Sequence, residues 1–131
     1  MKRIIHIAFL CVAFAALTFT AKAAEPVVKT GIEVLRDRNF EILKGKRVGL
    51  VTNPSGVDRF LNSTVDILFN APDVELVALY GPEHGVRGDV YAGGHVTDTK
   101  DEATGLPVYS IYGATRKPTP QMLEGIDVMV Y

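Results

Sequence analysis

Four short apolar segments, each bounded by turn residues, constrain the fold of this chain most strongly. They are rich in β-branched and aromatic residues, which is the composition of buried β-strands. The four segments are RVGLVT (47–52), VELVALY (74–80), PVYSIY (107–112) and DVMVY (127–131). Each is too short and too uniformly apolar for an amphipathic helix, so we expect four strands.

Helical patterns separate most of these strands. We expect helices over about 32–43, 61–68 and 119–125. In the second of them, Leu61, Val65 and Leu68 recur at the spacing of one helix face, and Asn62 or Ser63 caps it. The order strand, helix, strand, loop, strand, helix, strand predicts an α/β domain. We therefore expect a Rossmann-like, mainly parallel sheet with helices on both faces.

The amino-terminal residues have the pattern of a signal peptide. A basic segment, Lys2 and Arg3, precedes an apolar run from Ile4 to Phe19, and Ala21 and Ala23 are the small residues that a signal peptidase recognises. The run is shorter than the ~20 residues that span a bilayer, which favours cleavage over anchoring. We expect cleavage after Ala23, a mature domain over 24–131, and export to the periplasm or the outside of the cell.

Charge and cysteine content exclude several classes of protein. The segment 1–23 holds three of the 14 basic residues and none of the 15 acidic ones, so its removal shifts the net charge from −1 to −4. Such a chain has no general attraction for nucleic acid or an anionic membrane. The one cysteine, Cys11, lies in the predicted signal peptide, which excludes a disulfide framework. Neither a P-loop nor a dinucleotide-binding motif is present, and no cofactor is expected.

The small size of the predicted sheet suggests that more chain follows it. The last strand runs to Tyr131 with no helix after it, although parallel sheets are normally covered on both faces. We expect this chain to be the amino-terminal part of a longer protein. The alternative is a complete small α/β domain that ends in an edge strand.

Two segments follow strands at the edge of the sheet where α/β proteins bind ligands. They are Asn53–Gly56 and Gly81–Gly88. The second begins a stretch, 81–105, that holds six of the 12 glycines and two of the three histidines. A connection of that length is usually functional or disordered, and its apolar residues argue against disorder.

Three residues in this stretch carry the candidate chemistry. Glu83, His84 and Arg87 supply an acid, a titratable base and a fixed cation within five positions. Glu83 has the chemistry of a general acid, and Arg87 has the planar fork that binds a carboxylate. The alternatives are structural: Glu83 pairs with Arg87 to order the loop, and His84 is a packing residue.

Weaker candidates lie around them. His84 and His95 are potential metal ligands together with Glu83, Asp89 and Asp98, although their spacing matches no metal signature. Arg116 and Lys117 form either an anion site or a solvated surface. Four tyrosines of the apolar segments and the long loop either stack on a sugar ring or pack in the core: Tyr80, Tyr91, Tyr109 and Tyr112.

Three stretches together resemble the amino-terminal domain of the NamZ-type exo-β-N-acetylmuramidases, the family also called DUF1343. They are LKGKRVGLVTNPSGVD (43–58), LVALYGPEHGVRGD (76–89) and TGLPVYSIYGATRKPTPQMLEGIDVMVY (104–131). The octet GPEHGVRG is the most specific element. The resemblance covers nearly all of the residues after Ala23, whereas family members are about three times longer and carry a second domain.

The resemblance implies a glycoside hydrolase of peptidoglycan turnover that removes N-acetylmuramic acid from the non-reducing ends of cell-wall fragments. It implies Glu83 as general acid, with His84 as the second catalytic residue. The implied substrate-binding residues are Asn53, Arg87, Asp89 and Arg116. The implied partners are muropeptides and disaccharides.

The group that attacks the anomeric carbon, or activates the water that does so, stays open. Asp89, Asp98, a residue beyond Tyr131 and the substrate's own acetamido group are all candidates. Two other function classes also remain: a metal-dependent hydrolase that uses His84 and His95, and a non-catalytic module that binds muropeptide sugars.

Overall fold

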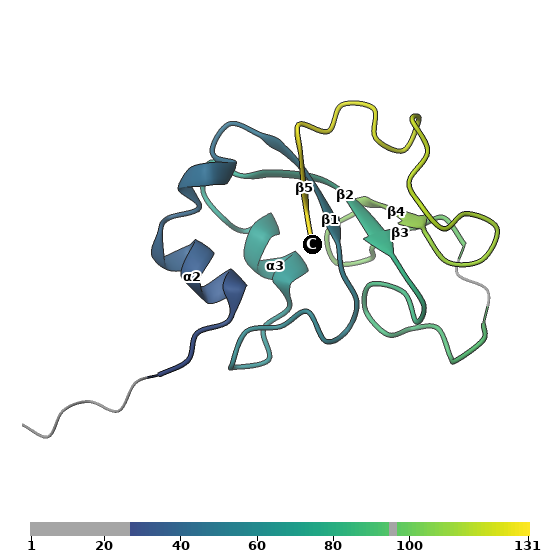
Figure 1. Cartoon of the computed structure of the whole chain (residues 1–131), viewed down its shortest axis with the longest axis horizontal. Helices are drawn as coiled ribbons and strands as arrows, with labels where there is room; N and C mark the ends of the chain where they lie inside the picture. Colours follow the sequence, from purple (N-terminus) through teal and green to yellow (C-terminus); the bar gives the residue numbers. More distant parts are fainter. Residues whose placement is uncertain (1–26, 95–96) are drawn as a thin grey trace, which may run out of the picture.

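A computed structural model describes residues 27–94 and 97–131 and shows one five-stranded sheet (Figure 1). The predicted signal peptide, residues 1–23, lies outside the described residues, and so does His95. The elements are α2 (Gly31–Asp37), the 3₁₀ helix η1 (Glu41–Leu43), β1 (Arg47–Val51), α3 (Thr64–Phe69), β2 (Glu75–Gly81), β3 (Thr99–Lys100), β4 (Pro107–Ser110) and β5 (Val128–Val130).

The sheet has the order β3-β4-β2-β1-β5 and is mainly parallel. β1 pairs in parallel with β2 and β5, and β2 pairs in parallel with β4. The short β3 runs antiparallel to β4. All four predicted strands are present, and the predicted class, a mainly parallel Rossmann-like α/β sheet, is confirmed.

One face of the sheet packs against the helices. Val48 and Leu50 are two residues apart on β1, so their side chains point to the same face of the sheet. Like Leu79 of β2, they are less than 2% exposed. The apolar side of α3 packs against them and completes the core. The residues that form this core are Phe40, Leu43, Val48, Leu50, Val65, Leu68, Ala71, Leu76, Leu79, Val86 and Val108. Figure 1 shows α2 and α3 together beside the sheet.

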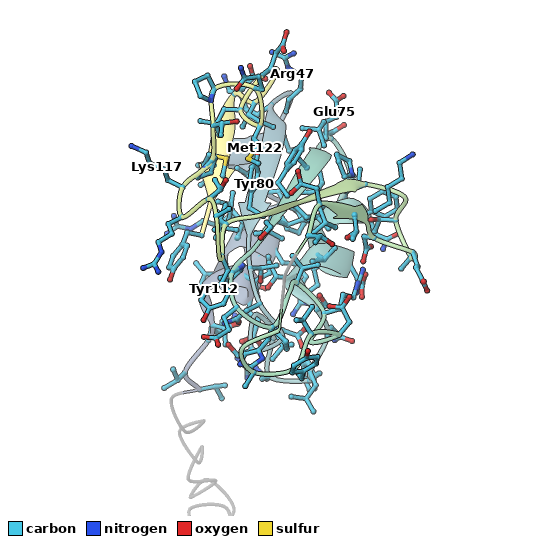
Figure 2. The ribbon with its side chains drawn as sticks, turned by 90° about the vertical axis from the view of Figure 1, so that its right-hand side faces the viewer. Arg47, Glu75, Tyr80, Tyr112, Lys117 and Met122 are labelled. Carbon is cyan, nitrogen blue, oxygen red and sulfur yellow. The ribbon has the colours of Figure 1, made fainter. Side chains whose placement is uncertain are left out.

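The segment between β4 and β5 covers part of the other face. The hydroxyl of the buried Tyr80 donates to the backbone carbonyl of Met122, and the two residues lie together in Figure 2. The ring of Tyr80 also lies 5.6 Å from that of Tyr109. Residues 120–125 form successive turns, where the sequence predicts a helix. Gly125, at φ +77°, ends them before a longer helix is established.

The helix predicted over 32–43 is divided in two. Asn39 and Phe40 both adopt left-handed backbone conformations, at φ +51° and +53°, between α2 and η1. This reversal carries Phe40 and Leu43 into the core, where they are 5% and 1% exposed. Burial of these two side chains therefore outweighs continuation of the helix.

No helix within residues 27–94 and 97–131 has the length and the apolar character that crossing a membrane requires.

Candidate functional site

Two loops meet where β1 and β2 end, an edge that we call the carboxyl edge of the sheet. Gly88 approaches the first loop so closely that a β-carbon there would lie 2.8 Å from Cγ of Pro54. Gly88 also has φ +81°, a conformation that favours glycine. The structure therefore places the two predicted segments, 53–56 and 81–88, against each other.

Asn53 orders the first loop through its own side chain. Its Oδ1 accepts hydrogen bonds from the backbone nitrogen of Ser55, at 3.1 Å, and from the Ser55 hydroxyl, at 2.7 Å. This is an Asx turn, which fixes the chain directly after β1. The side-chain amide of Asn53 is left to face solvent at the carboxyl edge, because the residue is exposed.

His84 is held by both its backbone and its ring. Its backbone has φ +74°, and its Nδ1 lies 3.0 Å from the backbone oxygen of Val90. A carbonyl only accepts hydrogen bonds, so Nδ1 carries the proton in this contact. In the neutral ring, Nε2 is then the unprotonated nitrogen, and the residue is exposed. His84 thus offers a base to the solvent side of the loop.

Glu83 is half-buried, and its carboxylate lies near enough to Tyr112 to affect the ionisation of that phenol. The Glu83 carboxylate raises the pKa of Tyr112, and the nearby positive charge of Arg116 lowers it. The pairing of β2 with β4 explains this meeting, because Gly81 lies opposite Ser110 and both chains continue for two more residues. Glu83, Tyr112 and Arg116 therefore form one cluster at the carboxyl edge.

Arg87 is committed to two carboxylates. Its Nε and Nη2 bond the carboxylate of Asp101 at 2.6 and 2.9 Å, and its Nη1 and Nη2 bond that of Asp66 at 3.0 and 2.8 Å. These contacts raise the pKa of Arg87. Four of the five donors of a guanidinium are thereby used, so no fork remains for a substrate carboxylate. Arg87 therefore pairs with Asp66 and Asp101 and not with Glu83, and a substrate-binding role for Arg87 stays a prediction.

The two aspartates considered as second carboxyl groups differ in environment. Asp98 accepts a hydrogen bond from the backbone nitrogen of Ser110 at 2.8 Å, which fixes it beside β4. Asp89 is exposed, and its Oδ1 would lie 2.5 Å from a β-carbon at Gly85, so it borders the turn that follows His84. Asp89 is therefore placed beside the loop that carries Glu83 and His84.

The comparisons with known proteins cover the segments that form this site. The family model for the amino-terminal domain of the exo-β-N-acetylmuramidase NamZ matches residues 48–131. The chain belongs to this family. The match includes both loops of the carboxyl edge and the segment that carries Tyr112 and Arg116, and the resemblance seen in the sequence is confirmed.

Two proteins that this chain matches are several times longer than the 131 residues. The chain is 55% identical over 109 residues to the peptidoglycan β-N-acetylmuramidase NamZ of Bacillus subtilis. The aligned residues make up 83% of this chain and 26% of that relative. A crystal structure of a DUF1343 family protein from Bacteroides fragilis superposes with a TM-score of 0.72 at 65% identity, covering 81% of this chain and 26% of that one. The chain thus spans about a quarter of the length of these relatives.

The metal hypothesis for this NamZ-family chain finds no ligand group in the part that the structure describes. No three His, Cys, Asp or Glu side chains gather there as metal ligands. His95 lies outside that part, so the pairing of His84 with His95 stays a prediction. A cavity of about 520 Å³ is lined by Arg87, Asp89 and Asp101 among others, but not by Glu83, His84 or Arg116.

Sequence reasoning missed three residues of this arrangement. Tyr112 was expected only to stack or pack, and the partners of Arg87, Asp66 and Asp101, were not singled out. Glu83 and Tyr112 each lie two residues after a pair of residues, Gly81 and Ser110, that face each other on neighbouring parallel strands. This equal spacing indicates that the two side chains lie near each other. That signal becomes readable only when the strand order, with β4 beside β2, is known.

Proposed function

We propose that this chain carries the acid group of an exo-β-N-acetylmuramidase that acts on peptidoglycan-derived sugars. Glu83 is the general acid, and His84 lies beside it with Nε2 free to accept a proton. Membership of the NamZ family and 55% identity to a peptidoglycan β-N-acetylmuramidase support the reaction class. The observation that carries the assignment is the position of Glu83 directly after β2, in the loop that meets the Asn53–Gly56 loop at the carboxyl edge.

The proposed cleavage begins with proton transfer. Glu83, in its protonated form, donates to the glycosidic oxygen as the bond to the anomeric carbon of N-acetylmuramic acid breaks, and a water molecule supplies the new hydroxyl at that carbon, directly or after attack by a carboxylate or the substrate's acetamido oxygen. The Glu83 carboxylate raises the pKa of Tyr112, so the phenol is expected to stay protonated beside the acid. Asn53 and Asp89, both exposed at the same edge, are proposed to bind sugar hydroxyls.

Arg116 is proposed to recognise the lactyl carboxylate of N-acetylmuramic acid. It is exposed, it lies close enough to Tyr112 to lower the pKa of that phenol, and it forms no ion pair within the described residues. A guanidinium binds a carboxylate through two parallel hydrogen bonds. Since Arg87 is engaged by Asp66 and Asp101, Arg116 takes the role for which both arginines were candidates.

The test is release of N-acetylmuramic acid from a chromogenic β-muramide. It is run with the protein and with its Glu83→Gln variant. Loss of a general acid lowers kcat by about 10²- to 10⁴-fold. Glu75→Gln is the matched control, because Glu75 is exposed at the opposite end of the same strand, near Arg47 in Figure 2.

Each outcome decides between function classes. Release by the parent protein and by Glu75→Gln, but not by Glu83→Gln, supports the muramidase. Saturable binding of a muropeptide without any release supports a non-catalytic sugar-binding module. Loss of release on adding a chelator supports the metal-dependent hydrolase. The anomer first formed, followed by NMR, separates a retaining route, including one through the acetamido group, from an inverting one.

Export is proposed from the sequence pattern alone. Residues 1–23 have the basic head, apolar run and cleavage motif of a signal peptide. Amino-terminal sequencing of the protein recovered outside the cytoplasm is expected to start at Ala24. Recovery of an uncleaved chain in the cytoplasm would contradict this proposal.

A further inference from the structure

The Arg87 side chain joins three parts of the chain that are distant in sequence. Arg87 belongs to the loop after β2, Asp66 to the first turn of α3, and Asp101 to the turn between β3 and β4. The four hydrogen bonds between them measure 2.6 to 3.0 Å. The arrangement is a double ion pair in which one guanidinium bridges two carboxylates.

Both carboxylates are attached to the core. The side chain of Asp101 is 3% exposed and also accepts from the backbone nitrogen and hydroxyl of Thr104, at 3.0 and 2.6 Å. Asp66 lies on α3, whose neighbouring residues Val65 and Leu68 are fully buried. The guanidinium of Arg87 is therefore bound on one side by Asp101 and on the other by Asp66, and both belong to well-packed parts of the fold.

The loop that contains Arg87 has no regular element, and besides the ion pairs it is held by Val86 in the core and by Gly88 against Pro54. Between the end of β2 and Asp98, the described backbone forms turns and bends with no regular element. Within it, His84 contacts Val90 through both Nδ1 and its backbone oxygen, at 3.0 and 3.4 Å. Arg87 lies between these two residues in the sequence, so its double ion pair fixes the centre of the closed turn.

We propose that Arg87 is a positioning residue that sets the place of Glu83 and His84 through its double ion pair with Asp66 and Asp101. The inference rests on the proposed function for its effect on catalysis. The planar fork of arginine is what allows one side chain to bridge two carboxylates with four bonds. Lysine keeps the charge but carries its three donors on one rotating nitrogen, so it does not reproduce the two paired contacts and leaves the loop freer to shift.

The experiment compares Arg87→Lys with Arg47→Lys in the full-length protein. Arg47 is the matched control, because it also makes a two-pronged pair, with Asp127, but at the opposite end of the sheet (Figure 2). A displacement of about 1 Å in catalytic groups lowers rates by roughly 100-fold. We expect Arg87→Lys to lower kcat by that order with KM nearly unchanged, and Arg47→Lys to alter neither.

A second readout is independent of activity. Long-range proton–nitrogen NMR spectra report which ring nitrogen of His84 carries the proton, and His84→Asn assigns the signal. We expect Nδ1–H in the parent and in Arg47→Lys, and a mixture of tautomers in Arg87→Lys as the contact with Val90 loosens. If Arg87→Lys does not fold, Asp66→Asn weakens the same pair at its more exposed carboxylate, which is 47% exposed.

The outcomes separate this inference from the proposed function. If no variant or parent releases N-acetylmuramic acid, the proposed function fails, and the His84 tautomer still decides whether Arg87 positions the loop. If kcat and the His84 signals of folded Arg87→Lys match those of the parent, the positioning role is overturned while the muramidase proposal stands.

Discussion

At the scale of single residues, the charge of Glu83 affects the pKa of Tyr112. The carboxylate raises the pKa of the Tyr112 phenol above its ordinary value of 10.0, first because it accepts a hydrogen bond from the neutral phenol and second because ionising the phenol would place two negative charges together. Replacing the carboxylate by an amide removes that repulsion. We predict that Glu83→Gln lowers the pKa of Tyr112, seen as earlier tyrosinate absorbance near 295 nm on raising the pH.

Tyr112→Phe identifies the tyrosine that responds. In that background, Glu83→Gln is expected to leave the titration curve unchanged. An unchanged curve for Glu83→Gln in the parent background would mean that Glu83 and Tyr112 do not interact in solution.

Arg116 gives a prediction about specificity. If its guanidinium binds the lactyl carboxylate, Arg116→Gln removes one charge-assisted hydrogen-bonded contact. Such a contact contributes about 1.5 to 3 kcal/mol of binding free energy. Because Arg116 is exposed, we expect the low end, roughly a tenfold loss of kcat/KM on a β-muramide.

Two controls accompany Arg116→Gln: a substrate without the lactyl group and a variant of the neighbouring Lys117. A β-N-acetylglucosaminide lacks the lactyl group, and any slow turnover of it should not change in Arg116→Gln. Lys117→Gln removes the neighbouring charge, and it should have little effect on the β-muramide. Equal losses in Arg116→Gln and Lys117→Gln would indicate general attraction rather than recognition.

At the scale of elements, the strands were predictable and the helices were only partly so. A buried strand depends on a local run of apolar β-branched residues, which 47–52 and 74–80 contain. The break at Phe40 depends instead on where that ring finds the core, which is information from tertiary packing. β3 is two residues long and exists through its pairing with β4, so no local pattern marks it.

The candidate site was predictable to a similar degree. The carboxyl edge of the sheet and the GPEHGVRG loop follow from strand order and turn composition. The partners of each side chain do not, because Arg87 meets Asp66 and Asp101 across 21 and 14 residues of chain. Such contacts are set by the fold and not by spacing in the sequence.

Gly49 in the centre of β1 gives a prediction for the sheet itself. A β-carbon at Gly49 would lie 2.7 Å from Sδ of Met129 and 2.9 Å from Cε2 of Tyr80. The thioether is flexible, but the Tyr80 ring is fully buried and bonded to the backbone of Met122. We predict that Gly49→Ala lowers the free energy of unfolding by about 1 to 3 kcal/mol, measured by urea denaturation.

Gly31→Ala is the control for this substitution. Gly31 lies in the first turn of α2, and a β-carbon added there would have no atom within 4 Å, so alanine should be neutral or slightly stabilising. A stability of Gly49→Ala equal to that of Gly31→Ala would show that Tyr80 yields easily and that this face of the sheet is loosely packed.

At the scale of the whole molecule, ion pairs join segments that the sheet does not connect. Asp101 joins the loop after β2 to the β3–β4 turn, Asp58 joins the turn before α3 to Arg36, and Asp127 joins the start of β5 to Arg47. Each carboxylate fixes one irregular segment against another part of the fold. The long loops are therefore ordered by charge as well as by apolar contact.

These three carboxylates predict how stability depends on pH. Arg87 lowers the pKa of Asp101 to about 2, and Arg47 lowers that of Asp127 to about 2. Burial raises the pKa of Asp58, but hydrogen bonds from Asn62, Phe60 and Arg36 outweigh it and bring the value to about 2. The ordinary value is 3.8, so each group binds its proton more readily in the unfolded chain.

The sign of the effect follows from these values. Stability contributed by a carboxylate with a lowered pKa is fully present above the ordinary value and is lost as the pH falls through the folded value. We predict that the free energy of unfolding is nearly constant above pH 5 and declines steeply from about pH 4 to about pH 2. Urea denaturation at closely spaced pH values measures this curve. Asp101→Asn cannot titrate at that position, so its curve should start lower and fall less. A parent curve that stays level to pH 2 would mean that these carboxylates are not preferentially ionised in the folded protein.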